Sequence, residues 1–395
     1  MIELFQRQVI RDFIRNNENE DPAQLMLKAS VGQDFPLKEA VAQIAARQKA
    51  KQKLPEWYAT EGIVFPPAIS MEQCSSELTA MFKARLFSGK ALVDLTGGTG
   101  IDSYYFSKHF KNVYFIEQQE HLCDLVRNNF NVLGASNIEI HSGNSLDFIA
   151  SNQLEIDLIY LDPARRDDKK NKVFMLMDCQ PDITLIQNAL FKKCRQILLK
   201  AAPMLDVNAA IMKLDGVKKI WVVAVENECK ELLILMEKGW LKEPIIEAVN
   251  IKSKSEINYF TFSKSEEATS AIGLSMPKKY LYEPNAAILK AGGFRSIAIR
   301  FDLKKLHPNS HLYTSASFIE DFPGRSFELT GIEQPHSRRL MELLPDGKAN
   351  ITARNFPETV AAVRKRTKIK EGGDIYIFAT TLLDRKPVFL LCKKA

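Results

Sequence analysis

Apolar and polar positions alternate along the middle of the chain in a pattern that predicts strands and helices in turn. Short apolar runs such as ALVDL (residues 91–95) and VYFIE (113–117) have the length and composition of buried strands. Amphipathic runs such as IDSYYFSKHF and HLCDLVRNNFNVLG separate them, and the alternation continues through IEIHSG, IDLIYL, QPDITLIQNALFKKC, QILLKAAP, KKIWVVAVE and NYFTFS. Residues 82–263 are therefore predicted to form an α/β domain, a mostly parallel sheet of seven strands covered by helices.

The segment before this domain, residues 1–81, has a helical pattern. Phe5, Val9 and Phe13 recur at roughly helical spacing. The run PLKEAVAQIAARQKAKQK is rich in helix-favouring residues and is predicted to stop near Pro55, which lacks a backbone donor.

The segment after the domain is less regular and more basic. The polar stretch SKSEEATSA predicts a linker, after which short apolar runs (RSIAIRF, DIYIFATTLL, PVFLLCK) alternate with turns and one helical run, FPETVAAVRKRTKIK. Residues 268–395 are thus predicted to be a small α+β module. They contain 21 Lys and Arg against 12 Asp and Glu, whereas the rest of the chain has 33 against 36. A solvated surface and a polyanion-binding surface both fit this surplus.

The composition argues against several other classes of protein. Six cysteines are scattered without CxxC pairs, and the six histidines show no paired metal spacing, so we expect neither a disulfide framework nor a metal site. Charges interrupt the N-terminal sequence every few residues, which argues against a signal peptide or a membrane span. We therefore expect a cytoplasmic protein.

A glycine-rich turn follows the first predicted strand. The sequence Asp-Leu-Thr-Gly-Gly-Thr-Gly (residues 94–100) stands between that strand and a predicted helix. Glycines let the backbone turn sharply and approach a ligand closely, and the carboxylate of Asp94 can accept hydrogen bonds from a cationic ligand. Glu117 ends the next strand, 23 residues after Asp94, where an acid can bind a ribose diol. These features predict a nucleoside-binding crevice.

The spacing of this turn differs from that of dinucleotide-binding folds. Its acid precedes the glycines, close to where a pyrophosphate would lie, so repulsion disfavours NAD. The turn resembles motif I of class I S-adenosylmethionine-dependent methyltransferases, and the resemblance spans about 180 residues. It implies a Rossmann-like domain with S-adenosylmethionine as cofactor, whose ribose Glu117 would hold. The other residues implied in cofactor binding are Asp94, Thr96, Gly97, Gly98 and Gly100 of the turn and, at the end of the fourth strand, Asp162.

Asn144 follows the third strand, where members of that family contact adenine. It stands where the family often has Asp, and its amide oxygen can accept a hydrogen bond from the adenine amino group. A simple turn residue is an equally open interpretation.

Asp162-Pro163-Ala164-Arg165 ends the fourth strand and resembles tetrapeptides of nucleic-acid base methyltransferases. The resemblance implies that the Asp162 side chain, at the edge of the cofactor crevice, and the Pro163 carbonyl accept hydrogen bonds from the target nitrogen. Arg165 stands where those tetrapeptides have an aromatic residue, so a stacking platform for a flipped base is missing or supplied elsewhere. Arg165 and the adjoining stretch 166–170 could bind phosphate or carboxylate in a loop beside the site.

Uracil-C5 RNA methyltransferases share Asp-Pro-Ala-Arg but need a cysteine at the end of the fifth strand. This chain reads Leu-Lys-Ala-Ala-Pro there (residues 199–203), so the covalent mechanism is rejected and direct in-line transfer is favoured.

The end of the chain carries a dense basic cluster beside aromatic residues that could stack on RNA bases. The cluster comprises Arg364, Lys365, Arg366, Lys368 and Lys370, and the aromatic residues are Phe356, Tyr376 and Phe378. Together with ELTAMFKARL and YLYEPNAAILKAG, this region resembles bacterial methyltransferases with a C-terminal THUMP-like domain. The resemblance implies a tRNA or rRNA substrate. Methylation of a small molecule or protein, and a non-catalytic RNA-binding role, are the alternatives.

Overall fold

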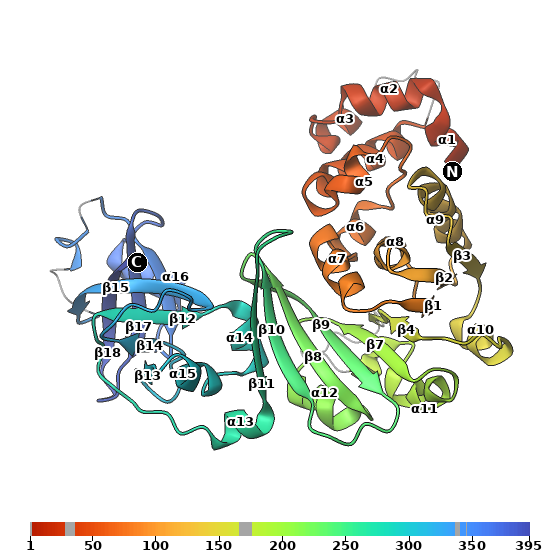
Figure 1. The fold of residues 1–395 in the computed structure, drawn as a ribbon. Helices are drawn as coiled ribbons and strands as arrows, with labels where there is room; N and C mark the ends of the chain where they lie inside the picture. Colours follow the sequence, from red (N-terminus) through yellow and green to blue (C-terminus); the bar gives the residue numbers. More distant parts are fainter. Residues whose placement is uncertain (1, 28–35, 166–175, 336–339, 345) are drawn as a thin grey trace. The chain divides into compact units, whose positions relative to one another are not determined.

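The structure is a computed structural model that describes every residue except 1, 28–35, 166–175, 336–339 and 345 (Figure 1). The chain divides into two compact units. The first comprises Met1–Lys218 with Leu232–Lys242, and the second comprises Lys219–Glu231 with Glu243–Ala395. No helix among the described residues is long and apolar enough to cross a membrane.

The chain begins with helices, as its sequence predicted. They are α1 (Ile2–Gln6), α2 (Gln8–Asn16), α3 (Pro22–Leu27), α4 (Leu37–Lys53), α5 (Pro55–Ala59), α6 (Ala68–Gln73) and α7 (Glu77–Arg85). Helix α4 ends just before Pro55, which takes the first position of α5, where a missing backbone N–H costs nothing.

Two buried amide side chains hold the extended segment between α5 and α6. The Gln43 amide donates to the Phe65 carbonyl (2.6 Å) and accepts from the Phe65 N–H (3.0 Å). Asn129 makes the same pair of bonds with Val64, at 2.8 and 3.0 Å. Because a buried backbone group without a partner is costly, these bonds fix the segment between α4 and α9.

A nine-stranded sheet follows, in the order β11-β10-β8-β9-β7-β4-β1-β2-β3 (Figure 1). Its strands are β1 (Gly89–Asp94), β2 (Phe110–Glu117), β3 (Ile138–Ser142), β4 (Leu158–Leu161), β7 (Gln196–Ala201), β8 (Val217–Val225), β9 (Glu228–Glu237), β10 (Ile245–Ile251) and β11 (Ile257–Ser263). The intervening helices are α8 (Ile101–Ser107), α9 (Glu120–Val132), α10 (Ser145–Ser151), α11 (Ile183–Lys193) and α12 (Val207–Lys213). The predicted α/β class is confirmed.

The sheet has nine strands where the sequence predicted seven, because β9 and β10 were missed. Most of β9 is buried, so its apolar run lacks the period-two alternation that marks a half-exposed strand. Strand β9 pairs antiparallel with β7, whereas β10 pairs parallel with β8 and antiparallel with β11.

The second unit contains a separate seven-stranded sheet, ordered β13-β14-β12-β15-β18-β17-β16. Its strands are β12 (Tyr280–Pro284), β13 (Lys304–Lys305), β14 (Tyr313–Ser315), β15 (Gly324–Glu333), β16 (Asn350–Arg354), β17 (Ile375–Thr381) and β18 (Pro387–Lys394). The helices of this region are α13 (Lys264–Thr269), α14 (Ala286–Ala291), α15 (Ser296–Arg300) and α16 (Val360–Thr367).

Two segments of this unit differ from their predictions. The stretch predicted to be a linker forms α13, which Ser263 caps by accepting a hydrogen bond from the Glu266 N–H (3.1 Å). The apolar run RSIAIRF forms α15, where the Glu267 carboxylate accepts from the Ser296 N–H at 2.9 Å. Both helices are short and are stabilised by side chains at their first turns, signals that an apolar pattern does not reveal.

Candidate active site

The glycine turn connects β1 to α8 at the carboxyl edge of the sheet. The Gly97 N–H donates to the Ile116 carbonyl (2.9 Å), and a Cβ at Gly97 would lie 2.3 Å from the buried Phe115 ring. Gly98 and Gly100 have φ angles of +55° and +78°, which side-chain-bearing residues rarely adopt. The turn therefore requires glycine at Gly97 for space and at the other two positions for conformation.

Asp94 holds this turn from inside the protein. It is 1% exposed, and its two oxygens accept from the Thr96 N–H (3.0 Å) and the Ser103 hydroxyl (2.6 Å). Burial raises the pKa of Asp94 to about 7, although these two hydrogen bonds favour the ionised form. Its geometry is that of a residue that shapes the turn, and direct contact with a cofactor stays a prediction.

Glu117 ends β2 beside the turn and is half-buried. Its carboxylate accepts from the backbone N–H groups of Gly98 and Gln119, both at 2.9 Å. The acid and the glycines are thus brought together, as the sequence suggested.

Asn144 caps helix α10. Its side-chain oxygen accepts from the Leu146 N–H (2.8 Å) and the Asp147 N–H (3.3 Å). The residue is exposed just beyond β3. Its predicted contact with adenine remains a prediction, and the observed role is the turn role that the sequence left open.

Asp162 lies directly beside the glycine turn. Its N–H donates to the Thr96 hydroxyl oxygen at 2.6 Å, which links the end of β4 to the loop after β1. One carboxylate oxygen binds the Lys200 ammonium group at 2.5 Å. The Asp162 side chain is 38% exposed and that of Lys200 only 10%, so the acid faces the opening while the lysine supports it from below.

Behind this pair lies a buried charged cluster that the sequence interpretation missed. Asp102 of α8 accepts hydrogen bonds from the hydroxyls of Tyr160 (2.6 Å) and Ser75 (2.9 Å). The ammonium groups of Lys83 and Lys200 lie 3.2 and 3.7 Å from its carboxylate.

Burial alone would raise the pKa of Asp102, but the two lysines, helped by the two hydroxyls, lower it to about 2. The sequence feature that could have indicated this cluster is Lys200, the one charged residue in the apolar run QILLKAAP.

Pro163 and Arg165 follow Asp162 at the carboxyl end of β4. Ala164–Arg165 forms the short strand β5, which pairs antiparallel with β6 (Cys179–Gln180). The stretch 166–170, suggested as an anion-binding loop, lies outside the described residues. In the described ranges, no group of three or more His, Cys, Asp or Glu side chains is arranged to hold a metal ion.

The two arginines of the C-terminal basic cluster are engaged within the module, whereas its three lysines are open to solvent. Arg364 donates to the carbonyls of Ile369 and Ala349, both at 3.2 Å. Arg366 pairs with Glu358 (2.8 Å) and donates to the Pro335 carbonyl. The three lysines of the cluster, Lys365, Lys368 and Lys370, are exposed.

The suggestion that nearby aromatic rings are free to stack is wrong for Phe378, which is 1% exposed within the core. Phe356 and Tyr376 are also packed against core residues and are only partly exposed. Tyr376 and Phe378 lie on β17, whose residues 377–380 are all buried, and proximity in sequence to the basic cluster did not reveal this burial.

Comparisons with known proteins assign the C-terminal region and the fold. Residues 280–323 match a family model described as a ferredoxin-like domain, and residues 324–394 match one described as THUMP domain-like. No curated protein matches the sequence significantly.

Solved structures include the crystal structure of a presumed methyltransferase from Porphyromonas gingivalis W83. It is 33% identical, covers 98% of both chains and superimposes with a TM-score of 0.87. An rRNA methylase from Streptococcus thermophilus is 16% identical over 40% of this chain and 94% of its own, with a TM-score of 0.30. A protein from Streptococcus mutans in complex with S-adenosylhomocysteine is 17% identical over 41% and 96%, with a TM-score of 0.31.

The last two likenesses are too remote to say anything about activity, whereas the first extends over nearly the full length of both chains. By this relationship and its C-terminal domain, the chain belongs to the family of class I S-adenosylmethionine-dependent methyltransferases with a C-terminal THUMP-like domain.

Proposed function

We propose that this enzyme methylates a base nitrogen in tRNA or rRNA by direct in-line transfer from S-adenosylmethionine. The observation that carries the proposal is the hydrogen bond between the Thr96 hydroxyl and the Asp162 N–H, at 2.6 Å. It joins the glycine turn to the Asp-Pro-Ala-Arg tetrapeptide, so a nucleoside at one and an acceptor at the other would be neighbours. In this proposal, residues 82–263 form the catalytic domain and residues 268–395 the RNA-binding module.

The residues of the turn fit S-adenosylmethionine. A Cβ at Gly98 would meet only the Thr96 carbonyl oxygen, at 3.7 Å, so the backbone there is open to close approach by a ligand. The half-buried Glu117 carboxylate has lone pairs left to accept hydrogen bonds from a ribose diol. When bound, the cofactor supplies an electrophilic methyl group on a positively charged sulfur. We assign its ribose to Glu117 and its amino-acid part to the turn that Asp94 shapes.

Asp162 would position the acceptor nitrogen. Lys200 holds one of its carboxylate oxygens, and no described residue binds the other. That oxygen can accept a hydrogen bond from an N–H of the base, and the Pro163 carbonyl can accept a second. Two fixed acceptors would align the lone pair of the nitrogen with the methyl group, a positioning effect rather than strong base catalysis.

The RNA assignment is supported by the THUMP-like match over residues 324–394 and by the exposed Lys365, Lys368 and Lys370. Such a surface gains affinity for a polyanion by releasing its counterions.

The test follows a radiolabelled methyl group from S-adenosylmethionine into total bacterial RNA. The wild type should label material that ribonuclease removes and protease does not. Asp162→Ala should lose at least ~100-fold in rate, the usual scale for a positioning group, and should still bind S-adenosylhomocysteine in calorimetry. Asp124→Ala, which removes an exposed carboxylate on α9, is the matched control. Label in protein would contradict the RNA substrate, and full activity of Asp162→Ala would contradict the role of Asp162.

A further inference from the structure

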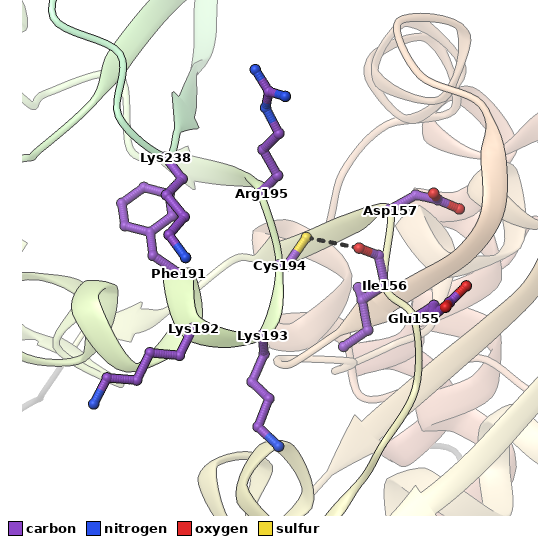
Figure 2. Close-up of a pocket in the computed structure, with 9 residues that line it drawn as sticks. All are labelled: Glu155, Ile156, Asp157, Phe191, Lys192, Lys193, Cys194, Arg195 and Lys238. Atoms are coloured by element: carbon purple, nitrogen blue, oxygen red, sulfur yellow. Dashed lines mark hydrogen bonds between the residues drawn. The ribbon is translucent and has the colours of Figure 1, made fainter.

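An open, solvent-facing cavity of about 470 Å³ lies at one end of strands β4 and β7, and Figure 2 shows the residues that line it. Asp157 and Arg195, which line it, immediately precede the parallel strands β4 and β7. The cavity is therefore at the amino ends of these strands, whereas the candidate active site is at their carboxyl ends. Its charged lining consists of Lys192, Lys193, Arg195, Lys238, Glu155 and Asp157.

Several of these charges are already occupied. The Asp157 carboxylate accepts from the Lys90 and Ala91 N–H groups at 2.6 and 2.9 Å. The Lys193 ammonium group donates to the Asn152 carbonyl (2.9 Å).

Arg195 binds Glu237 at 2.9 Å through one of its terminal nitrogens and is otherwise exposed. A guanidinium has five N–H donors, so most of those on Arg195 are left for a ligand.

Lys192, at the end of α11, and Lys238, just after β9, provide the open donors. Both are exposed, and neither ammonium group has a hydrogen-bond or ion-pair partner among the described residues. They lie in the part of the sequence where acids outnumber bases by 36 to 33, so the cavity is a local concentration of positive charge.

Further cations continue from this cavity around a partly exposed tryptophan. The ammonium groups of Lys218 and Lys242 lie 5.0 and 5.8 Å from the centre of the Trp240 ring, and Lys218 also binds Glu237 at 2.8 Å. Trp240 is two residues from Lys238, and Leu241 beside it is 97% exposed. Basic side chains with an aromatic ring among them are typical of nucleic-acid-binding surfaces.

We propose that this cavity, which we call the basic cavity, binds backbone phosphates of the RNA whose base is methylated at the opposite sheet edge. The inference rests on the proposed function. The six residues of β7 span about 20 Å at ~3.3 Å each. In double-stranded DNA this length corresponds to about six nucleotides per strand, at ~3.4 Å of helix axis each, so a nucleic acid must extend over several nucleotides to reach both edges. The basic cavity therefore selects a polynucleotide over a free nucleoside.

The experiment measures binding of fluorescently labelled total tRNA to the full-length protein over a range of KCl concentrations. Lys192→Gln with Lys238→Gln removes two phosphate contacts. The slope of log affinity against log salt should fall by about 1.5, which corresponds to about 30-fold weaker binding at ~0.1 M salt. Lys38→Gln with Lys51→Gln neutralises two exposed lysines of the N-terminal helices and should leave the slope unchanged. Calorimetry with S-adenosylhomocysteine should give the same affinity for all three proteins.

The outcomes separate this inference from the function on which it rests. A wild type that binds no tRNA or rRNA contradicts the proposed function and, with it, the role of the basic cavity. Salt-sensitive binding that survives unchanged in the Lys192/Lys238 variant overturns the inference alone. Inorganic phosphate at constant ionic strength is the last probe. It should compete with tRNA for the wild type more strongly than for the variant, because both ligands would occupy the basic cavity, and equal competition with the two proteins would overturn the inference.

Discussion

Lys200 is the cation that pairs with both acids of the candidate active site, Asp162 and Asp102. It is 8% exposed and is placed between Asp162 at the opening and Asp102 in the interior. A buried cation of this kind is favourable only because two carboxylates surround it, and each acid left without its partner costs several kcal/mol.

We expect Lys200→Met to lower the free energy of unfolding by about 3 kcal/mol, because Asp102 and Asp162 lose the cation that they share and only Lys83 remains beside Asp102. It should also lower methyl transfer beyond this loss of stability, since Asp162 loses its support. Urea denaturation and a methyl-transfer assay measure the two effects.

Lys83→Met is the matched comparison, because Lys83 lies against the same Asp102 but makes no contact with Asp162. It should destabilise the protein to a similar extent and leave the activity of the folded fraction intact. Equal losses of activity in both variants would show that Lys200 has only a structural role.

Because the pKa of Asp94 is raised in the folded protein, the free energy of unfolding should fall as the pH rises. Its pKa in the folded protein is about 7, against an ordinary value of 3.8. Between these values the folded state holds a proton that the unfolded chain has lost. The resulting stability is present in full below pH 3.8 and is lost as the pH rises through 7.

Asp94→Asn removes this dependence while preserving a donor and an acceptor for Ser103 and Thr96. Between pH 4.5 and 7.5, we expect the wild type to lose about 3 kcal/mol relative to this variant. Urea denaturation at both pH values measures the difference, and an unchanged difference would mean that Asp94 is ionised throughout.

The loop between β1 and α8 is the element that defines the cofactor crevice, and two of its glycines are required for different reasons. Gly97 leaves no room for a side chain against Phe115, whereas Gly98 has room but a φ of +55°. A substitution at Gly97 should therefore disturb folding, whereas one at Gly98 should mainly disturb binding of the cofactor.

Gly98→Ala should fold, at a cost of about 1–2 kcal/mol for the left-handed backbone. Its methyl group would project into the opening, so we expect binding of S-adenosylhomocysteine to weaken at least ~10-fold, or ~1.4 kcal/mol. Calorimetry tests this. Gly134→Ala has the same backbone cost, with a φ of +71° and no atom within 4 Å, and should bind normally. Equal affinity of the two variants would place the cofactor away from Gly98.

For helices, strands and turns, the sequence predicts those that have a local pattern of their own. It does not predict those that depend on contacts between distant parts of the chain. The strand, glycine turn and helix around Gly98 were recognised because each has its own signature. Strand β9 was missed because burial on both faces removes alternation. Lys200 was missed because its partners, Asp102 and Asp162, are far from it in sequence and near it only in the folded sheet.

For the whole molecule, binding of a polyanion depends on which cations are open to solvent more than on the net charge. The C-terminal surplus predicted from composition is present, but Arg364 and Arg366 bind backbone carbonyls and Glu358, so they contribute to the fold. The exposed lysines of that cluster are free to meet a polyanion. Composition cannot make this distinction, because it counts a cation paired within the fold and an open one alike.

Replacing Lys365, Lys368 and Lys370 with Gln should therefore weaken binding of total tRNA without unfolding the protein. Loss of three phosphate contacts lowers the slope of log affinity against log salt by about 2. Fluorescence anisotropy at several KCl concentrations measures the slope. Lys38, Lys51 and Lys111 changed to Gln provide an equal loss of charge outside the proposed RNA-binding module. A slope that falls equally in both variants would reflect net charge rather than contact.

Because β9 pairs with β7 but follows it in the sequence, one edge of β7 stays unpaired for a time while the ribosome synthesises the chain. Strand β7, which carries Lys200, ends at Ala201, but the strand that covers its free edge is complete only at Glu237, 36 residues later (237 − 201). At ~5–20 residues per second, the nascent chain holds this apolar edge unpaired for about 2 to 7 s. Slow codons between these two points would prolong that interval, during which neighbouring chains on a polysome can pair with it.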